Sequence, residues 1–83
     1  MTELVDVSRV RVLDDYQLFL QFEDGATGVF NVVPYLEKGV FSKLRDPEVF
    51  GAARIEGGGT VAWPGGIDIA PERLHNDMVR EQR

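Results

Sequence analysis

The stretch YQLFLQF, from Tyr16 to Phe22, constrains the fold of this chain most. Alternate positions in it are all apolar: Tyr16, Leu18, Leu20 and Phe22. A period of two is typical of a strand with one face against a core. The residues that follow, EDGATG, contain Asp24 and Gly25, which we expect to form a two-residue type I′ turn. The strand and its two neighbours would then form an antiparallel meander within the first 32 residues.

The preceding segment, LVDVSRVRVL, alternates with a change of phase. Its four valines are Val5, Val7, Val10 and Val12. A β-bulge near Ser8 and Arg9 would place all four on the core side, because a bulge inserts one residue into one strand of the pair.

From residue 32 to residue 51 the period of two is lost, which indicates short helical turns. We expect one turn over residues 34–36 and another over residues 40–44. Asp46 followed by Pro47 and Glu48 predicts a helix start. Asp46 would cap the helix N-terminus, Pro47 would occupy the first helical position, and the charge of Glu48 would interact favourably with the helix dipole.

The last third of the chain predicts short strands in AARIE, TVAW and IDI, with a flexible hairpin turn over residues 57–59. A C-terminal helix is expected to open at Pro71 and to bury Leu74, Met78 and Val79, with residues 80–83 frayed. The sequence therefore predicts one α+β domain over residues 1–83, an antiparallel meander sheet with short helical turns and one C-terminal helix.

Size and charge exclude several classes of protein. A chain of 83 residues buries only a thin core, so self-association or a protein partner is expected. The net charge is −5, and no basic patch is evident, so direct nucleic-acid binding is not expected. No apolar run is long enough to cross a membrane, and the N-terminus lacks the pattern of a signal peptide. With no cysteine in the sequence, we expect a cytoplasmic protein.

The sequence offers little catalytic chemistry. His75 is its only histidine and is expected to lie solvated on the exposed side of the terminal helix. One histidine and no cysteine do not make a zinc site. We therefore predict no catalytic residue, no metal, no cofactor and no small-molecule ligand.

Two features are candidate sites. The stretch VAWPGGIDIAPERL contains Trp63, Pro64, Gly66, Asp68 and Pro71, which form either a structural corner or a partner-binding surface. Within it, Asp68 is expected to cap the backbone amides of the helix that opens at Pro71.

The second feature is Phe19, which faces away from the apolar side of its strand, between Gln17 and Gln21. It packs beneath a helix on the second face of the sheet or belongs to an interface.

Three motifs coincide in order between Tyr16 and Leu74: Y-x-L-x-L-x-F-x-D-G, P-Y-L-x-x-G-V-F-x-x-L-R-D-P-x-x-F and V-x-W-P-x-G-x-D-[IL]-A-P-E-x-L. The chain resembles the small bacterial proteins grouped as domain of unknown function 2442. It departs from their pattern at Gly65, where asparagine is expected. The resemblance implies a small α+β fold with a meander and no established enzymatic activity. The resemblance also implies an attached domain or a protein partner: some members look joined to a helix-turn-helix domain, and others look like halves of toxin–antitoxin-like pairs.

Three hypotheses for the function follow. The first is a non-enzymatic protein-interaction module, the antitoxin-like or regulatory member of a two-protein pair, whose acidic charge suits a basic partner. The second is a regulatory domain that acts on DNA only through a dimer or an attached helix-turn-helix reader. The third is an unrecognised enzyme that uses Asp68 and His75 as acid and base.

Overall fold

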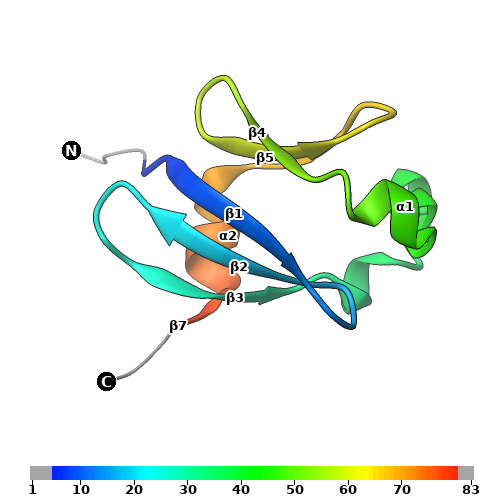
Figure 1. Cartoon of the computed structure of the whole chain (residues 1–83), viewed down its shortest axis with the longest axis horizontal. Helices are drawn as coiled ribbons and strands as arrows, with labels where there is room; N and C mark the ends of the chain where they lie inside the picture. Colours follow the sequence, from blue (N-terminus) through cyan, green and yellow to red (C-terminus); the bar gives the residue numbers. More distant parts are fainter. Residues whose placement is uncertain (1–4, 81–83) are drawn as a thin grey trace.

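The computed structural model describes residues 5–80, which form two antiparallel sheets and short helical segments (Figure 1). Sheet A has the strand order β1-β2-β3-β7, formed by Val7–Leu13, Gln17–Phe22, Thr27–Asn31 and Val79–Arg80. Sheet B has the order β4-β5-β6, formed by Arg54–Glu56, Thr60–Trp63 and Ile67–Ile69. The helical segments are the 3-10 helices η1 (Val33–Tyr35) and η2 (Gly39–Arg45) and the α-helices α1 (Pro47–Phe50) and α2 (Pro71–Asp77). The predicted α+β class, with its meander and C-terminal helix, is confirmed.

The predicted bulge in β1 is present, since the pairing of β1 with β2 shifts register between Val7 and Arg9. After the shift, Val10 pairs with Leu20 and Val12 with Leu18, so these valines share the face of the buried leucines. Their burial is incomplete, because Val10 is half-buried and Val12 is 36% exposed.

The predicted type I′ turn between β2 and β3 is wrong. The loop has three residues: the Gly25 amide donates to the Phe22 carbonyl, and the Phe22 amide donates to the Ala26 carbonyl, both at 2.9 Å. Of the loop residues, only Gly25 has a positive φ, 90°. This is the pattern of a type I turn followed by a glycine bulge. The Asp24 carboxylate holds it by accepting from the Ala26 amide at 2.9 Å.

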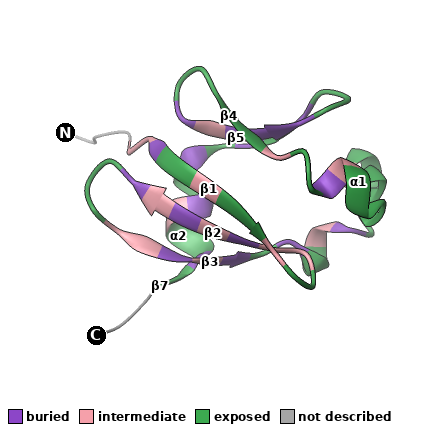
Figure 2. Cartoon of the chain, in the orientation of Figure 1, coloured by how far each residue is buried: buried purple, intermediate pink, exposed green. Residues whose placement is uncertain are grey.

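One hydrophobic core joins the two sheets and α2 (Figure 2). Its fully buried large side chains are Trp63, Phe22, Leu18, Leu20, Leu44, Ile67, Leu74, Val32 and Val61. Sheet A contributes to this core chiefly the alternate buried side chains of β2. From β6, Ile67 and Ile69 are buried. Because α2 places Pro71 and Leu74 in the same core, the last third of the chain closes over the inner face of the meander.

The predicted helix start at Asp46 is confirmed. Its carboxylate Oδ1 accepts from the Glu48 amide at 2.9 Å, Pro47 is the first helical residue and Gly51 ends the helix. The helix is four residues long, so this cap satisfies a large share of its free backbone donors. It fixes the angle at which Phe50 enters the core.

We therefore expect Asp46→Ala to lower the free energy of unfolding by about 1 kcal/mol, the typical effect of losing a helix cap. Urea denaturation followed by circular dichroism measures the change. Asp46→Asn is the control, because its side-chain oxygen retains the acceptor and its effect is expected to be much smaller. Equal losses in the two variants would contradict the capping role.

The C-terminal end differs from the expected helix. α2 ends at Asp77, and Met78 is extended, with φ −69° and ψ 151°. Arg80, expected to fray, pairs with Gly28 in β7, and Val79, expected on the helix stripe, pairs with Val29. A Cβ atom at Gly28 would lie 2.6 Å from the Val79 carbonyl oxygen, so glycine is what permits this pairing. The rest of the segment expected to fray, residues 81–83, lies outside the described residues.

Candidate protein-interaction surface

Trp63, the centre of the sequence motif, lies in the core. Its side chain is 1% exposed, its Nε1 donates to the Phe50 carbonyl at 3.0 Å, and its ring stacks on that of Phe50 with centroids 6.2 Å apart. A partner cannot reach this side chain while the domain is folded. Trp63 thus ties β5 to α1, which comes earlier in the chain.

The rest of the motif divides between the surface and the core. Pro64 and Gly66 lie in the exposed turn that joins β5 to β6, where Gly66 has φ 79°. Pro71 is buried as the first residue of α2. Asp68 is exposed between two buried isoleucines of β6.

Asp68 does not cap α2, contrary to our expectation. The residue at the N-cap is Ala70, and no side chain donates or accepts a cap hydrogen bond there. Asp68 instead pairs with Ala62 within sheet B and lines an open hollow of about 270 Å³. The other residues of this hollow are Tyr35, Phe41, Ile69, Ala70 and Arg73. Its position in the strand, facing away from the core, is what keeps the carboxylate from the helix amides.

Phe19 lies on the outer face of sheet A, opposite the face that packs on the core. Its strand partners are Arg11 on β1 and Val29 on β3, and Val29 in turn pairs with Val79 on β7. Paired residues of an antiparallel sheet share a face, so these four side chains form one row across all four strands. α2 lies on the other side of the sheet, and no element of residues 5–80 passes over the outer face (Figure 1).

We call Phe19, Val29 and Val79 the outer row. Phe19 and Val29 are half-buried by their neighbours within the sheet, and Val79 is 75% exposed. Phe19 and Val29 are not part of the core cluster or of the residues packed against it. We expected Phe19 either to pack beneath a helix or to belong to an interface. No helix of residues 5–80 lies above it (Figure 1).

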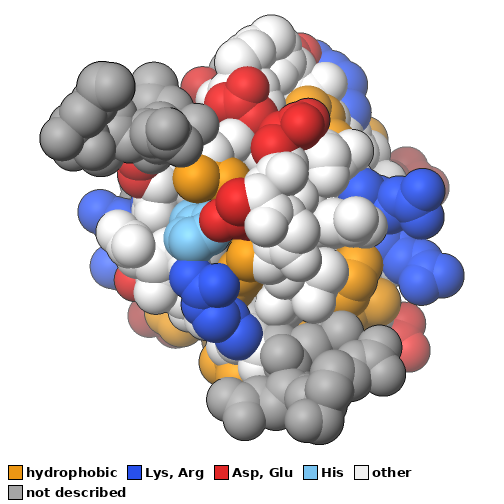
Figure 3. Space-filling view, turned by 90° about the vertical axis from the view of Figure 1, so that its left-hand side faces the viewer, with side chains coloured by type: hydrophobic (Ala, Val, Ile, Leu, Met, Phe, Trp, Pro, Cys, Tyr) orange, Lys and Arg blue, Asp and Glu red, His pale blue; other side chains and the backbone are white. Residues whose placement is uncertain are grey.

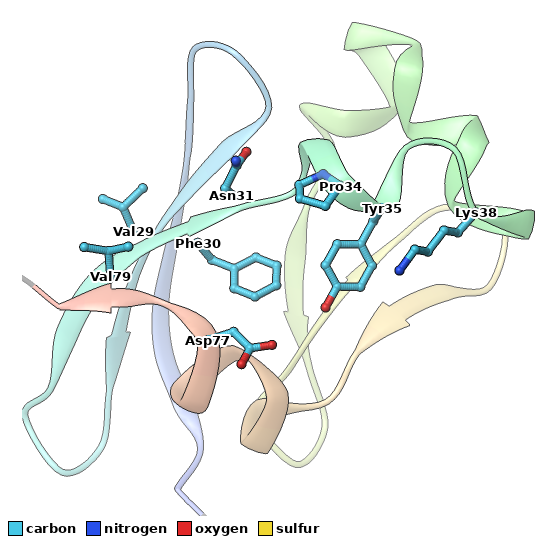
Figure 4. A pocket seen from close by; sticks show the side chains of 8 residues that line it. All are labelled: Val29, Phe30, Asn31, Pro34, Tyr35, Lys38, Asp77 and Val79. Carbon is cyan, nitrogen blue, oxygen red and sulfur yellow. The ribbon is translucent and has the colours of Figure 1, made fainter.

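One end of the outer row opens into a hollow of about 340 Å³. Val29 and Val79 border it at one side and Lys38 at the other, while Phe30 and Tyr35 point into it (Figure 4). The Lys38 ammonium lies 5.5 Å from the centre of the Tyr35 ring, a cation–π distance. The apolar surface therefore continues from the sheet into a cavity with a charged rim.

His75 is not the solvated side chain that we expected. Only 20% of its side chain is exposed, and its ring meets that of Phe22 edge-on, with centroids 4.7 Å apart. Nε2 lies 3.1 Å from Asp24 Oδ2, and Nδ1 lies 3.2 Å from Arg80 Nη2. Figure 3 shows the histidine at the surface between acidic and basic side chains. Because arginine can only donate, Nδ1 must accept, and Nε2 carries the proton that is donated to Asp24.

The pKa of Asp24 is lowered, chiefly because its carboxylate accepts a hydrogen bond from the Ala26 amide. Partial desolvation opposes this shift, and the neighbouring His75 and Arg80 add to the lowering. The ionised form of Asp24 is therefore the one that the folded chain favours.

A lowered pKa in the folded state means that Asp24 stabilises the fold above its unfolded pKa, near about 4, and that this contribution disappears as the pH falls through the folded pKa. We expect the unfolding free energy of the natural chain to fall more steeply between pH 5 and pH 2 than that of Asp24→Asn. Urea titrations at a series of pH values measure both slopes. Parallel slopes would contradict the assignment.

The two residues proposed as an acid–base pair lie in separate surroundings. His75 contacts Phe22, Asp24 and Arg80, whereas Asp68 lines the hollow next to Arg73. Arg73 itself donates to the Tyr35 hydroxyl at 3.2 Å, which raises its pKa. Within residues 5–80, no group of three histidine or acidic side chains is placed to hold a metal ion. Nor is any helix of that region long and apolar enough to span a membrane.

Residues 5–80 form a small α+β domain with one hydrophobic core, and none of their elements covers the outer face of sheet A. The model of the family described as protein of unknown function (DUF2442) matches residues 7–77, and the chain belongs to this family. No curated protein and no solved structure matches the chain.

Proposed function

We propose that this chain is a non-enzymatic protein-interaction module that binds a companion protein through the outer face of sheet A. The outer row carries the proposal. Its three apolar side chains lie side by side on a sheet face that no described element covers, and the aromatic one, Phe19, lies between Val29 and Arg11. A few anchor residues, often aromatic, supply most of the binding energy in protein interfaces.

The chemistry around the outer row favours a basic companion. Asp14 and Asp15 lie in the turn at one end of β2, and Glu23 and Asp24 lie in the turn at its other end. These acidic turns flank the outer face and do not lie on it: the Asp24 carboxylate contacts His75 on α2, behind the sheet, and Arg11 lies beside Phe19 on the face itself. The net charge of −5 favours a basic companion, since complementary charge accelerates association. In the finer form of the proposal, the chain is the antitoxin-like or regulatory member of a two-protein pair.

Photo-crosslinking in the native host tests the proposal directly. A photoreactive phenylalanine analogue placed at Phe19 is expected to give one discrete adduct with a second, basic protein. The same analogue at Val40 is the control, because Val40 is 45% exposed but lies on η2, away from sheet A. An adduct with a second copy of the chain only, or equal adducts from both positions, would overturn the proposal.

Phe19→Ser should separate binding from folding. Since Phe19 lies outside the core cluster, we expect the unfolding free energy to change by no more than about 1 kcal/mol, the span of strand propensities. Binding of the captured companion, measured by calorimetry, is expected to weaken at least tenfold, as for an aromatic anchor residue. Val40→Ser is expected to leave the affinity unchanged. Undiminished binding by Phe19→Ser would place the interface elsewhere.

A further inference from the structure

The two edges of sheet A differ. On one side, β7 covers Gly28 and Val29 of β3. On the other side, β1 pairs with β2 and with no other strand of residues 5–80. Sheet B meets β1 only near its beginning, where the Val7 amide donates to the Gly59 carbonyl at 3.1 Å, and the two then diverge (Figure 1). The edge of β1 from Arg9 to Leu13 is therefore without a strand partner in the described chain.

The side chains along this edge alternate in chemistry. Arg9 and Arg11 point to the outer face, and both are exposed. Val10 and Val12 point to the core side, where their cover is incomplete. A strand laid along β1 would place every second residue beside an arginine and the residues between them beside a valine.

The core side of the edge ends in a hollow of about 340 Å³ between β1 and α1. Apolar side chains of Val12, Tyr16 and Phe50 contribute to its walls. Asp14 and Asp15 also line this hollow, so carboxylates of a ligand are favoured beside the arginines and disfavoured at the hollow. The hollow suits an aliphatic side chain that projects from a strand added to β1.

We propose that the edge of β1 binds an extended segment of a partner protein, in which acidic and aliphatic residues alternate, by strand addition. Added strands gain affinity from main-chain hydrogen bonds and specificity from alternate side chains. Here Arg9 and Arg11 read the acidic positions, and Val10, Val12 and the hollow read the aliphatic ones.

The same arginines argue against a second copy of this chain as the occupant. In an antiparallel pairing of two β1 strands centred on Val10, Arg9 of each copy would face Arg11 of the other. Like charges directly opposite one another destabilise a strand pair. Charged side chains on an edge are also the usual means by which proteins prevent self-pairing. The arginines thus disfavour pairing of two β1 strands and favour pairing of β1 with a strand that carries carboxylates.

This site adjoins the outer row at Arg11, which pairs with Phe19, but it uses the free edge of β1, and its test does not depend on the companion proposed above. The probe is the blocked peptide Gly-Glu-Val-Glu-Val-Glu-Val-Gly, titrated into the isotope-labelled full chain and followed by amide NMR spectra. We expect shifts centred on residues 9–13 and a dissociation constant at least tenfold lower than that of a peptide with the glutamates and valines in separate blocks. We expect the lysine-for-glutamate peptide not to bind.

A charge-reversed variant provides the matched test. In Arg9→Glu/Arg11→Glu, which changes only exposed residues, the preference is expected to invert in favour of the lysine peptide. Lys38→Glu/Lys43→Glu, at two exposed positions at the start of and within η2, is the control with the same change of charge and is expected to retain the original preference. Three results would overturn the proposal: no shifts along β1, equal binding of the acidic and the basic peptide, or shifts confined to Phe19, Val29 and Val79. Shifts along β1 that grow with protein concentration in the absence of peptide would overturn it in favour of a second copy.

Discussion

Trp63→Ala is expected to lower the free energy of unfolding by about 3–5 kcal/mol, the range for removal of a large buried aromatic side chain. The substitution opens a cavity between sheet B and α1, because the ring stacks on Phe50 and is almost wholly buried. It also removes the shorter of two hydrogen bonds to the Phe50 carbonyl, which then keeps only the Ala53 amide at 3.3 Å. For a domain of this size, the loss is comparable with the whole stability.

Urea denaturation followed by circular dichroism measures this loss, since the substitution removes the only tryptophan and with it the fluorescence signal. Trp63→Phe separates the two causes: it keeps most of the apolar volume and removes the donor, so a smaller loss of about 1–3 kcal/mol is expected. Val40→Ala, at an exposed position, is the control and is expected to stay within about 0.5 kcal/mol. A loss below 1 kcal/mol for Trp63→Ala would contradict the placement of the ring in the core.

Gly59→Ala is expected to have the second largest effect, a loss of about 3 kcal/mol. Gly59 has φ 76°, and a Cβ atom there would lie 2.3 Å from Asp6 Cβ and 2.6 Å from Asp6 Cα. The backbone cannot easily retreat, because the Gly59 carbonyl accepts the Val7 amide. The left-handed conformation costs about 1–2 kcal/mol for alanine, and the clash adds about 1–3 kcal/mol.

The neighbouring glycine is a matched control for this prediction. Gly58 has nearly the same conformation, φ 84°, but a Cβ atom there would meet nothing within 4 Å. Gly58→Ala should therefore show the conformational part alone, about 1–2 kcal/mol. Urea midpoints of the two variants, compared at equal slope, give the difference. If the two alanine variants were equally stable, the contact between the β4–β5 turn and Asp6 would be absent in solution.

The strands could be predicted from the sequence because their signals are local. The alternation in YQLFLQF places Leu18 and Leu20 on the core face whatever surrounds them, and Asp46 followed by Pro47 starts a helix by local hydrogen bonding alone. The predictions were wrong at segments whose conformation depends on contacts with residues far away in the sequence. Met78 leaves the helix because Val79 finds a strand partner on β3, about fifty residues earlier in the chain. The turn prediction failed because it took Asp24 for a turn former only, whereas its carboxylate holds a longer loop.

The candidate site was harder to predict for the same reason. The motif around Trp63 favours a structural corner but leaves a partner-binding surface open, since the burial of its ring depends on Phe50, which lies on α1. His75 looks exposed on a helix drawn alone and becomes largely covered only when Phe22 and Arg80 are in place. Phe19 could be assigned to the second face of the sheet from alternation. Its row of neighbours, however, needed the register of β3 and β7.

The long sequence separation between β3 and β7 also affects the order in which the strands pair during folding. The meander pairs residues close in sequence, so its loops close at small entropic cost, whereas the pairing of Val29 with Val79 closes a far larger loop. We expect β7 to dock late in folding and to open first in native-state hydrogen exchange. Since Val79 supplies the most exposed side chain of the outer row, that surface is complete only once the chain has finished folding. A companion bound there would slow the opening of β7, so it would protect the chain from proteases that act on partly opened molecules.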